Sequence, residues 1–365
     1  MGEDLRPIRA YIRITDGVIT RIYESKPVHI DIYFEDSVIV PGFINMHTHI
    51  ADSIAKEKAY GLSVEEAVAP PDGLKHRILR EASKDEIIDG IRTAIREMLG
   101  CGITTFVDFR EGGSSGVEVL REAIAGTGIN AIILGRPDGA TIGEILAVSD
   151  GIGLSSINHY DDQYLRRVNK YAKKYNKIVA YHASETPRQR QKSIERHGTS
   201  DIVRGVRLLD PDFIVHITYA DEGDLRFLST RKSFVVLCPR ANGYFGHIPP
   251  IASVLKYGIE FGIGTDNIMI NSPNIFREFD YIIRIARTQG ITIPLKMLLK
   301  SVTTTPAKRL SLKTGCIAEG YKADLIIFDL SKPNVSYIDD PITAIVARGS
   351  TQNIKQVYLS GREVE

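Results

Sequence analysis

The chain has 365 residues, of which 43% are hydrophobic and 25% charged, and this balance excludes a disordered or low-complexity protein. Lysine plus arginine (46) nearly equals aspartate plus glutamate (45), so no overall field draws the protein to nucleic acid or to an anionic membrane. An N-terminus without an apolar signal sequence, the lack of a membrane-spanning apolar run and three widely spaced cysteines predict a soluble, cytoplasmic protein without disulfides.

Both ends of the chain are expected to form short strands. Residues 7–40 contain β-branched segments around a Thr15-Asp16-Gly17 turn, and residues 316–365 contain further short strands at 324–330 and 356–359. Neither end is long enough to bury a sheet face alone. We therefore expect residues 1–40 and 312–365 to pair into one small β-sandwich domain.

The middle of the chain alternates short β-branched runs with longer helical stretches, which is typical of parallel βα units. The helix expected at 84–99 begins with a capping box, Ser83 and Glu86, and ends at Gly100. Eight β-branched runs lie at 38–46, 104–109, 131–135, 152–157, 178–181, 213–217, 234–237 and 260–264. Further helices are expected at 164–175, 187–197, 275–289 and 294–299. Eight such units predict a (β/α)8 TIM barrel over residues 41–311.

Potential metal ligands stand where four of these strands end. His47 and His49 close the first strand, and alternate side chains of a strand point to the same face. His182, His216 and Asp266 lie at the ends of strands five, six and eight. In a parallel barrel these ends meet at the active-site face. Three neutral imidazoles and a carboxylate suit one divalent ion, Zn²⁺ or Fe²⁺.

The order of these motifs resembles the amidohydrolase superfamily across nearly the whole chain. The motifs are residues 41–49, Gly102-Ile103-Thr104-Thr105 with Asp108, His182-Ala183-Ser184-Glu185, His216, Cys238-Pro239-Arg240-Ala241-Asn242, Gly264-Thr265-Asp266-Asn267 and residues 320–325. The His-x-x-Glu at strand five is similar to the one-metal branch, which contains cytosine, adenosine, guanine and S-adenosylhomocysteine deaminases and triazine chlorohydrolases. The run at 152–157 has no lysine or glutamate to bridge two ions, which also favours a single metal.

The resemblance implies a role for each site residue. The metal ligands would be His47, His49, His182 and Asp266, with zinc preferred over iron. Glu185 would shuttle protons, because a carboxylate beside activated water can take a proton and return it to the leaving group. His216 would orient the attacking oxygen and stabilise developing charge, and Asp266 would double as ligand and base.

Substrate contacts are expected from Arg110, Arg136 and Arg240, which follow strands two, three and seven, and from Asn242. Guanidinium groups match carboxylate and phosphate oxygens, so these arginines suggest a substrate with an anionic tail. Salt bridges with loop acids such as Glu111 and Asp138 are the alternative. The chain has no tryptophan, unlike many related deaminases, which argues against S-adenosylhomocysteine itself as the substrate.

Three functions are compatible with this pattern. The first is an aminohydrolase that replaces an exocyclic amine of a purine, nucleoside or related heterocycle with oxygen. The second is hydrolysis of a cyclic amide, as in imidazolonepropionase-like enzymes, or dechlorination of a triazine. The third is a non-catalytic scaffold, which the full set of expected ligands disfavours. The expected partner is a small heterocyclic molecule, and a homo-oligomer is compatible with the sequence.

Overall fold

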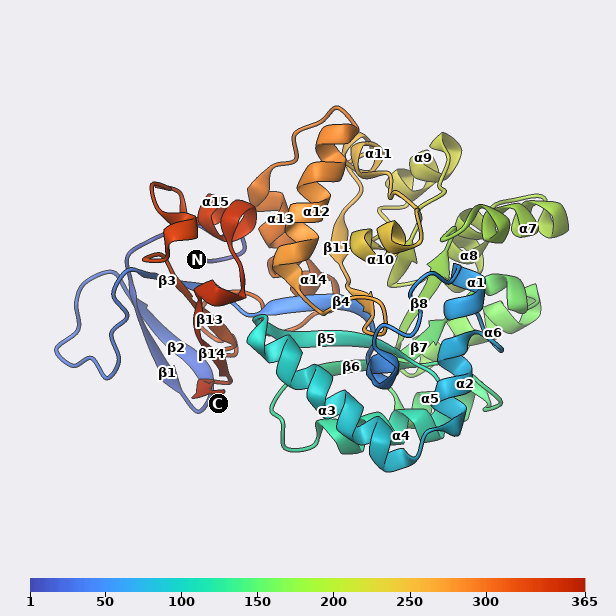
Figure 1. Cartoon of the computed structure of the whole chain (residues 1–365), viewed down its shortest axis with the longest axis horizontal. Coiled ribbons are helices and arrows are strands. Elements are labelled where there is room, and N and C mark those ends of the chain that lie inside the picture. The colour runs from blue at the N-terminus through green and yellow to red at the C-terminus, as the bar shows by residue number, and fades with distance from the viewer. Residues whose placement is uncertain (365) are drawn as a thin grey trace.

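A ring of parallel strands forms the centre of the computed structural model, which describes residues 1–364 (Figure 1). The strands follow chain order: β4 (Phe43–His49), β5 (Ile103–Arg110), β6 (Asn130–Gly135), β7 (Gly151–Leu154), β8 (Ile178–Ala183), β9 (Phe213–His216), β10 (Val235–Leu237) and β11 (Phe261–Ile263). The short strand β12 (Asp266–Asn267) follows β11 and pairs in parallel with the end of β4. This pairing brings the last strand back to the first, and the predicted (β/α)8 barrel is confirmed.

Helices cover the outside of the ring. They are α1 (Val64–Ala67), α2 (Leu74–Glu81), α3 (Lys84–Gly100), α4 (Gly113–Ile124), α5 (Ile142–Val148), α6 (Asp162–Lys174), α7 (Pro187–His197), α8 (Asp201–Leu209), α9 (Glu222–Thr230), α10 (Pro239–Tyr244), α11 (Ile251–Lys256), α12 (Ile275–Thr288), α13 (Leu295–Ser301) and α14 (Thr304–Arg309). The capping box of Ser83 and Glu86 is present at α3. Within the described part of the chain, no helix has the length and apolarity that crossing a membrane requires.

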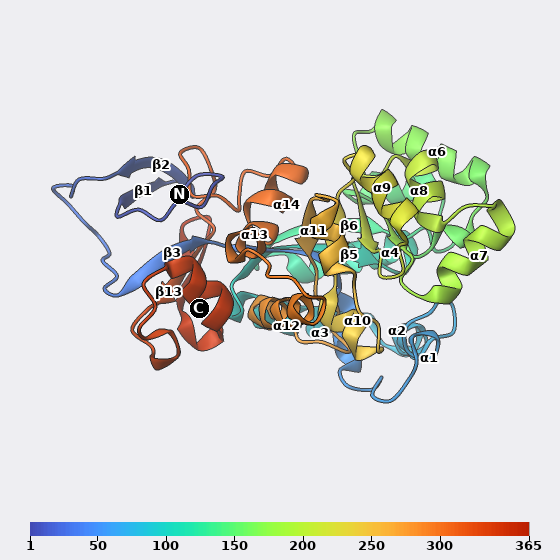
Figure 2. The same ribbon diagram turned by 90° about the horizontal axis from the view of Figure 1, so that it is seen from above.

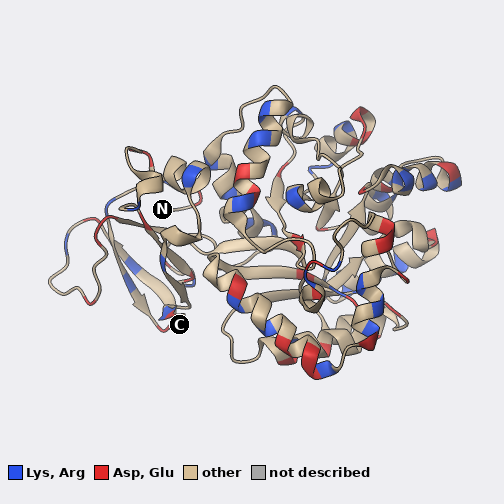
Figure 3. Cartoon of the chain, in the orientation of Figure 1, with Lys and Arg blue, Asp and Glu red and all other residues tan. Residues whose placement is uncertain are grey.

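Two apolar clusters hold the barrel together. Side chains such as Ile44, Val107 and Phe213 fill the interior of the ring. A larger cluster packs the outer faces of the strands against the helices, with Phe106 of β5 and Ile91 of α3 among its members. Figure 3 shows acidic and basic residues interleaved along the outer helices, while the barrel strands are nearly free of charge. The ends of the strands are therefore held by a rigid, close-packed scaffold.

The chain ends form two antiparallel sheets beside the barrel (Figure 2). One sheet has the order β15 (Arg362–Glu363), β14 (Ile354–Leu359), β13 (Leu325–Asp329) and β3 (Ser37–Pro41), and the other pairs β1 (Tyr11–Thr15) with β2 (Val18–Tyr23). The short helix α15 (Pro341–Thr343) lies between β13 and β14. Ile19 of the two-stranded sheet and Leu325 and Ile327 of β13 share a buried cluster, as expected for a small sandwich. The exact domain boundaries at residues 41 and 311 stay a prediction.

The expectation of one strand over residues 38–46 is wrong. The run is divided at Gly42 into β3, which joins the terminal sheet, and β4, which joins the barrel. A Cβ atom at residue 42 would lie 2.1 Å from the hydroxyl oxygen of Thr104. Only glycine allows the backbone to pass β5 this closely, and the chain changes sheets at this point.

Candidate metal centre

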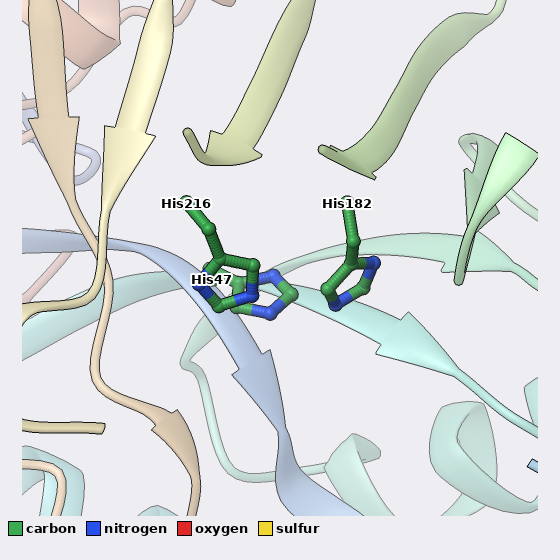
Figure 4. Close-up of side chains that lie close together, drawn as sticks. All are labelled: His47, His182 and His216. Atoms are coloured by element: carbon green, nitrogen blue, oxygen red, sulfur yellow. The ribbon is translucent and has the colours of Figure 1, made fainter. Parts of the chain in front are cut away.

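Three histidines from three strands point toward one another at the carboxyl ends of the barrel strands (Figure 4). His47 comes from β4, His182 from β8 and His216 from the end of β9. Their ring nitrogens lie within 4.8 Å of one another, and all three side chains are buried. Phe109 packs edge-on against the His47 ring, with 4.5 Å between the centroids, and so restricts its rotation.

His49 and Asp266 complete the cluster. Asp266 Oδ1 lies 3.2 Å from His47 Nε2 and 3.6 Å from His49 Nε2, and His49 Nε2 lies 3.4 Å from His182 Nε2. Ligand atoms about 2.0–2.1 Å from a tetrahedral ion are separated by about 3.3 Å, so these spacings fit one ion. His47 Nε2, which faces the cluster, has no hydrogen-bond partner, as expected of a nitrogen that binds a metal ion. The four predicted ligands are therefore brought together.

The tautomers of two histidines favour metal binding through Nε2. His182 Nδ1–H donates to the carbonyl oxygen of Leu154 at 2.9 Å, and His49 Nδ1 lies 3.0 Å from the carbonyl oxygen of Phe109. A proton on Nδ1 leaves the lone pair on Nε2, which faces the cluster. Burial lowers the pKa of His49 to about 3 and that of His182 well below its usual value, so both rings are neutral.

Asp266 supplies the negative charge of the centre. Burial alone would raise the pKa of its carboxyl, but the imidazoles of His47, His216 and His49 outweigh burial and hold it well below the usual value. The residue adopts a positive φ of 62°, and His216 a positive φ of 77°. Both are non-glycine residues in a sparsely populated backbone region, where such strain often marks functional sites.

Glu185 lies at the edge of the cluster, within 4.8 Å of ligand atoms of His216 and Asp266. Its Oε1 is 3.9 Å from His216 Nε2, and its side chain is 19% exposed. Burial and the nearby Asp266 carboxylate raise the pKa of Glu185 to about 7. The loop that carries it is fixed by Asp201, whose carboxylate accepts hydrogen bonds from the Ser184 backbone and hydroxyl. A carboxyl group with this pKa can both accept and donate protons near neutral pH.

His216 faces the cluster with Nε2, which has no hydrogen-bond partner. Its Nδ1 lies 3.4 Å from Asn242 Nδ2. Asn242 is buried and belongs to α10, immediately after β10. The predicted substrate residue Asn242 therefore contacts the ring of His216 and helps to orient it.

The three predicted substrate arginines do not form one group. Arg110 Nη1 and Arg136 Nη2 approach the carboxylate of Glu111 at 3.5 and 3.6 Å. Arg240 instead binds the fully buried Glu278, with 3.3 Å between Nη1 and Oε1, and donates to the Ser272 carbonyl oxygen. The expected guanidinium trio is thus divided, because Glu278 of α12 supplies a separate buried partner for Arg240.

Two charged residues of the site were not predicted from the sequence to be functional. Glu111 follows β5, and its Oε1 lies 2.8 Å from His49 Nδ1. Lys75 of α2 donates from Nζ to the same oxygen at 2.7 Å. The position of Glu111, an acidic residue at the end of a barrel strand, could have identified it as a site residue. No local sequence pattern distinguishes Lys75. The cations Lys75 and Arg136, together with His49, hold the pKa of buried Glu111 well below its usual value, although burial opposes them.

A parallel (β/α)8 barrel with a buried His/Asp cluster at the ends of its strands defines a metal-dependent barrel enzyme. A model of the amidohydrolase family matches residues 38–364, and the chain belongs to this family.

Relatives and solved structures support this assignment. A putative aminohydrolase of Methanothermobacter thermautotrophicus is 34% identical over 384 residues, which cover 100% of this chain and 96% of the relative. A 5-methylthioadenosine/S-adenosylhomocysteine deaminase of Pyrococcus furiosus is 25% identical over 398 residues, which cover 100% and 92%. The structure of an adenosine deaminase from Xanthomonas campestris with bound zinc superposes with a TM-score of 0.86 at 19% identity, covering 100% of this chain and 90% of that one.

Proposed function

We propose that the protein is an aminohydrolase that uses one divalent metal ion, preferably Zn²⁺, to replace an exocyclic amine of a nitrogen heterocycle with oxygen. The observation that carries this proposal is the convergence of His47, His49, His182 and Asp266, with contacts of 3.2–3.6 Å between neighbouring ligand atoms and with Glu185 next to them. When bound, the ion lowers the pKa of a coordinated water molecule toward about 7. The deaminases among the relatives agree with the proposed reaction.

Glu185 and His216 divide the remaining chemistry. The Glu185 carboxylate takes one proton from the attacking water and delivers it to the ring nitrogen of the substrate. It then takes the second proton from the hydroxyl group of the tetrahedral adduct and delivers it to the amine, which departs as ammonia while the carbonyl forms. His216 Nε2 points into the same space and has no protein partner, so it can hydrogen-bond to the attacking oxygen and steady the tetrahedral adduct. Asn242 keeps the His216 ring in this orientation.

We further propose that the substrate carries an anionic group that contacts Arg110 and Arg136. Both side chains are buried close to the metal centre, and Arg110 Nη1 and Arg136 Nε lack hydrogen-bond partners. With Lys75, three cations face the single carboxylate of Glu111. The Arg136→Met variant should raise the KM of an anionic substrate and leave that of a neutral analogue unchanged, and an unchanged KM for both removes Arg136 from recognition.

The reaction is tested by ammonia release from a panel of purines, pyrimidines, nucleosides, pterins and triazines, each with and without an anionic substituent. The Glu185→Gln variant should keep the metal and lose about 10²–10⁴-fold in kcat. Wild-type turnover in this variant removes Glu185 from the proton path. Chloride release from a chlorotriazine, or ring opening of a cyclic amide without ammonia, would replace deamination by one of the alternative hydrolyses. A protein that binds less than about half an equivalent of metal would support the scaffold alternative.

We place the enzyme in the cytosol. The three cysteines are free and buried in the structure, which agrees with a reducing compartment.

A further inference from the structure

Helix α2 packs against the barrel through a lysine. Lys75 is 2% exposed and is the one buried residue of this eight-residue helix. Lysine is rarely buried without a strong reason, and a cation in the first turn of a helix is opposed by the helix dipole. An apolar side chain at this position would pack α2 against the barrel at a lower free-energy cost of burial. The burial of Lys75 therefore indicates a role other than stability.

The role is indicated by what Lys75 contacts. Its Nζ donates to Glu111 Oε1 at 2.7 Å, and the same oxygen lies 2.8 Å from Nδ1 of the metal ligand His49. A continuous chain of polar contacts thus joins α2 to the metal centre through one carboxylate oxygen. Figures 1 and 2 place α1 and α2 at the end of the molecule opposite the terminal sheets, together with the loops of the barrel.

Glu111 is placed to control the orientation of His49. His49 Nδ1 lies 2.8 Å from Glu111 Oε1 and 3.0 Å from the carbonyl oxygen of Phe109, so two acceptors hold the proton on Nδ1 and leave the lone pair on Nε2. His49 Nε2 is 3.6 Å from Asp266 Oδ1 and 3.4 Å from His182 Nε2. Lys75 in turn fixes the position of Glu111 Oε1, because Arg136 Nη2 is farther from this oxygen, at 3.6 Å, and Arg110 Nη1 lies 3.5 Å from the other oxygen, Oε2.

We propose that Glu111 is a positioning residue for His49 and that Lys75 makes metal affinity depend on the docking of α2 onto the barrel. This inference rests on the metal centre of the proposed function and adds to it a coupling between two parts of the chain. Coupling of this kind is reciprocal: if docked α2 strengthens metal binding, bound metal must stabilise docked α2 to the same extent.

The first experiment measures zinc affinity of the full chain by competition with a chromophoric chelator. Loss of a partner of a metal-binding histidine typically costs about 10–100-fold in affinity, and we expect a loss in this range for Glu111→Gln and near its lower end for Lys75→Met. Lys75→Arg should retain most of the affinity because the charge remains.

The chain offers a matched control pair. Lys56 Nζ lies 2.6 Å from Glu97 Oε2, and this salt bridge ties the same segment, residues 50–82, to α3 without touching a metal histidine. Lys56→Met and Glu97→Gln should therefore bind zinc like the wild type. Thermal unfolding of the metal-free variants shows whether each one is folded. If Glu111→Gln does not fold, Lys75→Met by itself tests the inference.

The second experiment follows amide hydrogen exchange of residues 74–81 with and without zinc. We expect zinc to slow exchange in the wild type and in the control variants, and to have little effect on this helix in Lys75→Met. The inference would be overturned if Lys75→Met and Glu111→Gln bound zinc as tightly as the wild type. It would also be overturned if zinc protected residues 74–81 from exchange in Lys75→Met as much as in the wild type. Either result would leave the metal centre intact. A wild-type protein that binds no zinc would overturn both.

Discussion

Gly264 directly follows β11 and lies close to the backbone of β4 at His47, a proposed metal ligand. A Cβ atom at residue 264 would stand 2.5 Å from His47 Cβ and 2.9 Å from the His47 backbone nitrogen. Carbon atoms in normal contact are about 3.5–4.0 Å apart, so in Gly264→Ala the two strands must separate by about 1 Å. Such overpacking costs about 1–3 kcal/mol, and the stiffer unfolded chain offsets about 0.4–1 kcal/mol. The difference is a loss of about 0–2.6 kcal/mol in the free energy of unfolding, and we expect a value in the upper part of this range, about 2 kcal/mol, because part of the contact is with the His47 backbone, which cannot rotate away. We also expect weaker metal binding.

Urea unfolding of the metal-free protein, followed by circular dichroism, measures the stability, and chelator competition measures the zinc affinity. Gly262→Ala, two residues earlier in β11, is the matched control, because its Cβ would meet Met46 Cγ at 2.9 Å and the Phe234 ring at 3.3 Å. The Met46 side chain is flexible and binds no metal, so this variant should lose about 1 kcal/mol or less and keep its zinc affinity. Wild-type stability and zinc affinity in Gly264→Ala would show that the strands are not in close contact at His47.

Three other predictions follow from the charges of the site. The kcat/KM should fall as the pH drops through the pKa of Glu185, because the protonated carboxyl group cannot accept a proton. This pKa is about 7 without metal and lower beside a cation. An activity that rises on acidification would contradict this prediction. Removing the metal should abolish turnover and lower the melting temperature. Zinc at 100 times its Kd should raise the free energy of unfolding by about 2.7 kcal/mol. Equal melting temperatures with and without zinc would contradict the proposed zinc site. Arg240→Met should cost about 3 kcal/mol at pH 8, because fully buried Glu278 loses its partner. The cost should shrink at pH 5, where Glu278, whose pKa burial raises to about 7, is protonated; a pH-independent cost argues against the pair.

The barrel and the clustering of the proposed metal ligands were predictable because both depend on patterns that are local in the sequence. Each strand is a short β-branched run, and parallel strands of a barrel end at one face, so a polar residue at the end of a run has a defined place. His47 and His49 share a face because the strand period is two. The same reasoning predicts that His182, His216 and Asp266 lie near these histidines, and the structure brings their side chains into one cluster.

The remaining site residues depend on contacts between distant segments. Lys75 is buried only because Glu111 lies opposite, and an isolated helical pattern would place that lysine in solvent. Arg240 was expected at the substrate mouth, but its partner Glu278 belongs to a helix that begins more than 30 residues later. The break at Gly42 likewise depends on Thr104 of the neighbouring strand. Pairings of this kind have no local signature.

The terminal sheet has a consequence for how the chain is made. Strand β3 directly precedes the first barrel strand, yet its hydrogen-bonded neighbour is β13, in the register of Pro41 with Leu325. During synthesis from the N-terminus, β3 must wait until almost the whole polypeptide has left the ribosome before it finds this neighbour. Nascent chains arrested before residue 325 would therefore carry β3 as an unsatisfied edge, open to chaperones or to the same strand of another nascent chain.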